Sequence, residues 1–112
     1  MSGSASPQLE NGYTRIANEL LEAIIKYPFC ATEYKIVWLV IRNTYGWNKK
    51  EALMSYGMIA KEINVSISYV KKIMKNLIKN MVILRAKQKN RNLLVLNKTY
   101  TSWGCEIGRA HV

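Results

Sequence analysis

The stretch of residues 64–80, NVSISYVKKIMKNLIKN, has no acidic residue and carries four lysines, Lys71, Lys72, Lys75 and Lys79. Exposed helix faces usually mix Glu with Lys, because opposite charges three or four positions apart stabilise a helix. Here the spacing places the ammonium groups on one side of a helix with nothing in the stretch to neutralise them. One explanation is a solvated face. The other is a binding surface for a negatively charged partner.

The excess of positive charge extends beyond this stretch. Residues 1–62 contain seven Lys or Arg and six Glu, so this half of the chain is close to neutral. Residues 63–100 contain nine Lys or Arg and no acidic residue. Nucleic acid is the commonest partner for such a one-sign charge distribution. An acidic membrane surface would require, in addition, a broad apolar face left exposed.

The elements that would position the lysines can be predicted from the spacing of apolar residues. A first helix is expected from Tyr13, and Tyr27-Pro28 ends it, because the residue before a proline avoids the helical region. A second helix begins in the segment ATEYK, with Thr32 as its expected N-cap and Gly46 as its left-handed terminator. This helix is apolar over most of its circumference, which predicts that it is the most buried.

The basic residues belong to the elements that follow. A brief strand is predicted at residues 52–54, and Ser55 is expected to cap a short helix. A three-residue turn ending at Ser66 interrupts that helix, and Ser66 can cap the next one. In this last helix the lysines face one way, and the opposite, apolar sector contains Ile67, Val70, Ile73, Met74, Leu77, Ile78 and Met81.

Two extended segments, residues 82–87 and 93–97, bracket the polar run 88–92 and predict an antiparallel hairpin. This order of elements, a short helix, a turn, a basic helix and a hairpin, is the layout of a winged helix-turn-helix. This is an α+β, mainly α fold, with a three-helix core and a C-terminal β-hairpin wing. An α-helix fits the DNA major groove, and cations that neutralise phosphates release counterions. The layout therefore predicts binding to double-stranded DNA.

The chain has 112 residues, enough for one compact domain. We expect a flexible lead at residues 1–12, a single DNA-binding domain at 13–103, and a tail at 104–112 that is vector-derived or part of a truncated linker. Within the domain, Trp38 is expected in the core. Core packing is favoured over a dimer contact for Trp47 and Trp103.

The predicted DNA-binding residues divide by their position. Those at the N-terminal end of the basic helix, where base edges would be read, are Ser66, Ser68, Tyr69 and Lys72. For Tyr69, a role in packing is as well supported as a DNA-facing role. Lys71 can reach a base or a phosphate. Those better placed for phosphates are Lys75, Asn76 and Lys79, and those of the hairpin are Lys87, Lys89 and Arg91. Phosphate contacts would position the protein, and base contacts would specify the sequence.

Other functions find little support in the residues. The chain has no Asp and no Gly-rich phosphate loop, and its single His111 lies in the tail, so we expect no enzyme activity and no cofactor. Cys30 and Cys105 lack partners at ligand spacing and are expected to be free thiols. No apolar run approaches the roughly 18–20 residues that span a membrane, and no signal peptide is evident. A soluble, intracellular protein is expected.

Three segments carry a family resemblance that general winged-helix proteins lack: Asn11-Gly12-Tyr13, residues 15–21 (RIANELL) and residues 41–50 (IRNTYGWNKK). With them, the chain from Gln8 to about Trp103 resembles the N-terminal domain of phage replication protein O, the lambdoid origin-binding initiator. The closing Leu96-Asn97-Lys98 also resembles the end of that domain.

The resemblance implies a role in the host cytoplasm. Such proteins bind repeated sites at a phage replication origin, often as dimers, and recruit the host replicative helicase or its loader. A separate C-terminal region, for which this chain has no room, does the recruiting. The chain is thus expected to be the DNA-binding part of an initiator. Two alternatives stay open: a winged-helix transcriptional regulator that binds an operator, and a protein-interaction module for an acidic partner.

Overall fold

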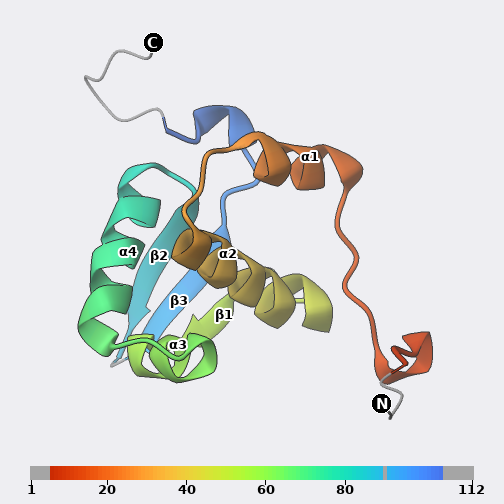
Figure 1. Cartoon of the computed structure of the whole chain (residues 1–112), viewed down its shortest axis with the longest axis horizontal. Coiled ribbons are helices and arrows are strands. Elements are labelled where there is room, and N and C mark those ends of the chain that lie inside the picture. Colours follow the sequence, from red (N-terminus) through yellow and green to blue (C-terminus); the bar gives the residue numbers. More distant parts are fainter. Residues whose placement is uncertain (1–5, 90, 105–112) are drawn as a thin grey trace.

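The computed structural model describes residues 6–89 and 91–104 (Figure 1). Within them the chain forms a mainly helical α+β fold, as predicted. The helices are α1 (Asn18–Lys26), α2 (Ala31–Thr44), α3 (Tyr56–Ile63) and α4 (Ile67–Lys79). The strands are β1 (Ala52–Met54), β2 (Ile83–Gln88) and β3 (Arg91–Leu96), and three short 3-10 turns are η1 (Leu9–Asn11), η2 (Tyr45–Trp47) and η3 (Tyr100–Ser102).

The three strands form one antiparallel sheet in the order β1-β3-β2. The brief strand predicted at residues 52–54 is confirmed. The hairpin is confirmed too, but its predicted five-residue connection at 88–92 is wrong. Gln88 pairs with Arg91, so only residues 89 and 90 separate the strands. A two-residue connection is the commonest link in hairpins.

The helices cover one face of the sheet (Figure 1). Helix α2 packs against β1 and β3, and α4 packs against β2. Side chains alternate between the two faces along a strand, and β3 follows this rule: Asn92, Leu94 and Leu96 are buried toward the helices. The centre of α2 is fully buried at Ile36 and Val37, which confirms α2 as the central helix.

The first helix is shorter than predicted. It begins at Asn18 and not near Tyr13, because residues 13–17 are extended. Ile16 packs against the core from this extended segment, so its match to the helical period was misleading. The predicted end is confirmed, since Tyr27 adopts an extended conformation before Pro28.

Helix α2 begins in the predicted segment ATEYK and ends within residues 43–46 as expected, but both predicted capping residues are wrong. The N-cap is Cys30 and not Thr32, because the Glu33 carboxylate accepts a hydrogen bond from the Cys30 backbone N–H at 2.8 Å in a capping box. At the other end, the left-handed residue is Asn48, with φ of 55°, and not Gly46.

Gly46 leaves room for neighbouring side chains and does not form a left-handed turn. A Cβ at this position would lie 2.9 Å from Arg42 Nη1 and 3.1 Å from Thr14 Oγ1. The glycine therefore allows the extended N-terminal segment to approach the end of α2 closely.

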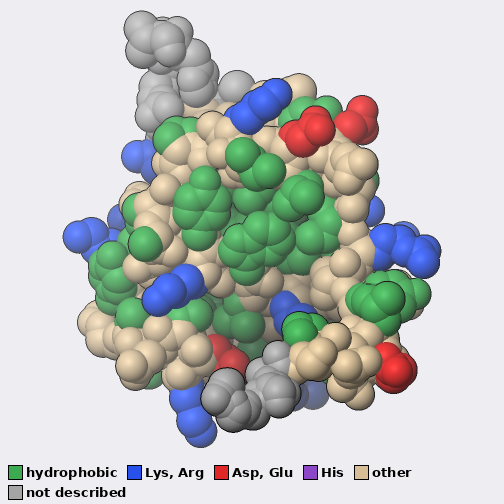
Figure 2. All heavy atoms as spheres, turned by 45° about the vertical axis from the view of Figure 1, so that its right-hand side comes forward, with side chains coloured by type: hydrophobic (Ala, Val, Ile, Leu, Met, Phe, Trp, Pro, Cys, Tyr) green, Lys and Arg blue, Asp and Glu red, His purple; other side chains and the backbone are tan. Residues whose placement is uncertain are grey.

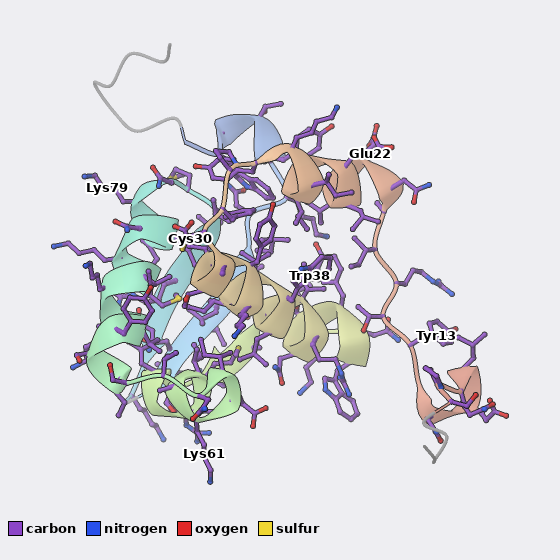
Figure 3. The ribbon with its side chains drawn as sticks, viewed as in Figure 1. Tyr13, Glu22, Cys30, Trp38, Lys61 and Lys79 are labelled. Atoms are coloured by element: carbon purple, nitrogen blue, oxygen red, sulfur yellow. The ribbon has the colours of Figure 1, made fainter. Side chains whose placement is uncertain are left out.

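The three tryptophans differ from the prediction in part. Trp38 is 40% exposed and Trp47 is 62% exposed, so the core assignment is wrong for both. Figure 3 shows Trp38 on the side of α2 turned away from α4, and Trp47 lies beneath the Arg42 guanidinium at 5.2 Å in a cation–π contact. Trp103 is 6% exposed, which confirms its place in the core.

Candidate nucleic-acid interface

Helices α3 and α4 are joined by the three-residue turn predicted from the sequence, and side-chain caps begin both helices. Ser55 Oγ accepts a hydrogen bond from the Met58 backbone N–H at 3.1 Å, and Ser66 Oγ accepts one from the Tyr69 backbone N–H at 3.2 Å. Both caps were predicted and are confirmed. Asn64 takes a left-handed conformation, with φ of 60°, and lets the chain reverse direction between the helices.

Helix α4 separates its side chains into two faces. Its buried residues are Val70, Ile73, Met74 and Leu77, and its exposed polar residues are Ser68, Lys71, Lys72, Lys75, Asn76 and Lys79. Two members of the predicted apolar sector are misplaced, because Ile67 is 49% exposed and Met81 is 39% exposed. Ile67 lies in the first turn beside Gly57, and Met81 follows the helix with φ of 63°.

A groove of about 620 Å³ is lined by residues of α4 and β2, together with residues at the start of α3 and one residue of β3. We call it the α4–β2 groove. Four cationic residues line it: Lys71 and Lys75 from α4, and Arg85 and Lys87 from β2. The other lining residues are Ser55, Tyr56, Gly57, Ile67, Ile78 and Asn92. Residues from the basic helix and the hairpin thus meet at one surface feature.

Arg85 was not among the predicted site residues. It pairs with Leu94 in the sheet register, and its Nη1 donates a hydrogen bond to Tyr56 Oη at 3.1 Å. The alternation of side chains along β2 could have revealed it. Arg85 and Lys87 are two and four positions after the buried Ile83, so all three belong to the sheet face that the helices cover. Tyr56 has no such signal in the sequence.

The structure places the remaining predicted residues around the α4–β2 groove and not in it. Ser66, Ser68 and Tyr69 are exposed at the start of α4, where the two serine hydroxyl oxygens lie 3.3 Å apart. Figure 3 shows Lys79 at the far end of α4, pointing away from the body. Four further predicted residues are exposed outside the groove: Lys72 and Asn76 on α4, and Lys89 and Arg91 at the hairpin tip.

Over residues 6–89 and 91–104, no three His, Cys, Asp or Glu side chains gather where they could hold a metal ion. In the same ranges, no helix has the length and apolar character needed to cross a membrane. Cys30 is an exposed free thiol. Cys105 and His111 lie outside the described residues.

Fold and site together define a small α+β domain whose basic helix and basic hairpin share one surface. Residues 6–104 match the family model described as Bacteriophage replication protein O. The chain belongs to this family, which confirms the resemblance.

Three relatives agree with this membership. Replication protein 15 of Enterobacteria phage phi80 is 30% identical over 101 residues, which cover 90% of this chain and 33% of the relative. Replication protein O of Escherichia phage lambda is 42% identical over 41 residues, 37% of this chain and 12% of the relative. DNA replication protein gp18 of Salmonella phage P22 is 49% identical over 43 residues, which cover 38% of this chain and 16% of the relative. The matched regions thus span a third or less of these relatives.

Proposed function

We propose that this chain is the origin-binding domain of a phage replication initiator, which binds double-stranded DNA sequence-specifically as a winged helix-turn-helix. The observation that carries the proposal is the convergence of Lys71, Lys75, Arg85 and Lys87 on one groove between α4 and β2. Cations from two elements at one surface suit a phosphate backbone, because each neutralised phosphate releases condensed counterions and strengthens binding.

In this proposal α4 enters the major groove and the β2–β3 hairpin acts as the wing. The capped N-terminus of α4 exposes Ser66, Ser68 and Tyr69, which would read base edges together with Lys72. Lys71 serves a base or a phosphate. The phosphate contacts are then made by Lys75, Asn76 and Lys79 on α4 and by Lys87, Lys89 and Arg91 on the wing.

The replication role is supported by family membership and by the names of the relatives, each of which is a replication protein. We also propose that the protein is non-enzymatic and acts in the cytoplasm of a bacterial host. Dimers on repeated origin sites, and recruitment of a helicase or its loader by a further C-terminal region, complete the proposal for the longer proteins.

A selection experiment tests the proposed function. The protein is mixed with duplexes of random sequence, the bound fraction is amplified over several rounds, and the enriched sequences are compared with the genome of the source phage or prophage. We expect one enriched motif that recurs as repeats in the replication origin. A motif found once, upstream of the protein's own gene, would indicate a transcriptional regulator. Absence of any enriched motif would contradict sequence-specific binding.

A further inference from the structure

The α4–β2 groove holds one basic side chain, Arg85, that hydrogen-bonds to a neighbouring side chain. Arg85 reaches across from β2, and its Nη1 donates to Tyr56 Oη at 3.1 Å. Tyr56 is the first residue of α3, and its half-buried ring packs against the core. The hydroxyl that holds Arg85 is therefore attached to the body of the domain and not to a flexible surface chain.

A held arginine differs from the lysines around it. The guanidinium group has five N–H donors in a rigid fork, and the bond to Tyr56 uses a donor on Nη1, so most of the fork is left for a second acceptor. Arginine binds phosphate oxygens with two parallel hydrogen bonds, whereas lysine acts as a point charge on a flexible stem. Holding the fork before binding reduces the conformational entropy lost on binding.

The position of the groove indicates what would occupy it. In duplex DNA a phosphodiester strand separates the major groove from the adjacent minor groove. If α4 lies in the major groove and the hairpin flanks it, that strand runs between them. The groove that Arg85, Lys71, Lys75 and Lys87 line joins the exposed side of α4 to the hairpin, so a strand on this path would pass through it.

We propose that the α4–β2 groove holds the phosphodiester backbone of one DNA strand, with Arg85 as a direct phosphate ligand and Tyr56 as its positioning residue. This inference rests on the proposed function and deepens it, because it places the phosphate contact inside the groove as well as at the hairpin tip. Gly57 contributes by leaving the wall of the groove without a side chain.

The experiment measures duplex affinity over a series of salt concentrations for the wild-type chain, Arg85→Gln, Arg85→Lys and Tyr56→Phe. A lost phosphate contact lowers the slope of log affinity against log salt by about 0.9, which is about an eightfold loss of affinity at about 0.1 M salt. We expect this result for Arg85→Gln. Arg85→Lys should keep the slope, because it keeps the charge, but bind more weakly, because it lacks the fork.

Tyr56→Phe separates positioning from a general structural role. It keeps the ring and loses only the hydroxyl, so affinity should fall about two- to tenfold in the wild-type background. In the Arg85→Gln background the same change should have no effect, because no guanidinium is left to position. Equal losses in both backgrounds would overturn the positioning role. Thermal unfolding of each variant checks that the fold is intact.

The outcomes distinguish this inference from the function on which it rests. A steep wild-type slope that Arg85→Gln leaves unchanged would overturn the groove assignment alone. A wild-type chain whose duplex binding does not depend on salt would overturn the proposed function and the groove assignment together.

Discussion

The face formed by α4 and the hairpin differs from the face formed by α1 and α2, although one core lies beneath both. The exposed charges of α4, β2 and β3 are all basic. On the α1–α2 side, Figure 2 shows hydrophobic side chains gathered at the centre of the face, with acidic and basic groups at its margins. The basic surface is thus not a requirement of the fold. Such a difference in charge is expected if a polyanion binds the α4–hairpin face, as proposed above.

The largest expected effect concerns the core that the two faces share. Trp103 contacts Tyr27 edge-on, with ring centroids 5.8 Å apart, and its Nε1 donates to the Asn97 carbonyl oxygen at 2.9 Å. Trp103→Ala should lower the free energy of unfolding by about 3–5 kcal/mol, measured by urea denaturation. Trp47→Ala, at an exposed site, should cost only about 1 kcal/mol, the value of its cation–π contact. Similar losses of stability in the two variants would mean that Trp103 contributes no more to the shared core than the exposed Trp47 does.

The second prediction tests the difference in surface charge. Lys71→Ala with Lys75→Ala removes two contacts in the α4–β2 groove and should weaken duplex binding about 60-fold at about 0.1 M salt, or about 2.4 kcal/mol. The matched control, Lys26→Ala with Lys35→Ala, removes the same charge from α1 and α2. It should change affinity little, because neither lysine lines the α4–β2 groove and salt screens exposed charges that make no direct contact. Equal effects of the two pairs, measured by fluorescence anisotropy, would show that only net charge matters.

The third prediction compares the two helix caps. Ser55→Ala and Ser66→Ala should each lower the free energy of unfolding by about 1 kcal/mol, because each removes an N-cap hydrogen bond. Only Ser66→Ala should also change the DNA motif that selection enriches, since Ser66 begins the proposed reading helix. A change of motif in Ser55→Ala as large as in Ser66→Ala would contradict this division of roles.

The smallest expected effect lies at the end of α2. The Tyr45 hydroxyl is a buried polar group without a hydrogen-bond partner among the described residues, so Tyr45→Phe should raise the free energy of unfolding by up to about 1 kcal/mol. Burial also raises the pKa of this hydroxyl above its ordinary value of 10.0. The folded state then holds the proton after the unfolded state has lost it, so stability falls as pH rises through 10. The advantage of Tyr45→Phe should therefore grow above pH 10, and a constant or shrinking advantage in denaturation series would contradict this.

Local signals in the sequence predicted much of this architecture. The caps at Ser55 and Ser66, the central burial of α2 and the hairpin all follow from periodicity and side-chain chemistry at short range. The failures arise from tertiary contacts. Ile16 packs from an extended segment, and the side chains of Arg42 and Thr14 approach Gly46 closely. No local sequence pattern predicts such tertiary contacts.

The candidate site shows the same limit. Its lysines on α4 could be predicted because helical spacing places them opposite buried residues. The bond between Tyr56 and Arg85 joins residues 29 positions apart, and only the assembled fold brings them together. The predicted roles of individual residues toward DNA stay predictions.

The most direct test of the central claim is the salt dependence of duplex binding by the unmodified chain. If Lys71, Lys75, Arg85 and Lys87 each neutralise one phosphate, log affinity should fall with log salt with a slope of about −3.6, and the exposed lysines around the α4–β2 groove should make it steeper. A slope near zero, or binding to an acidic protein with no preference for a duplex, would contradict the claim that this surface binds a DNA backbone.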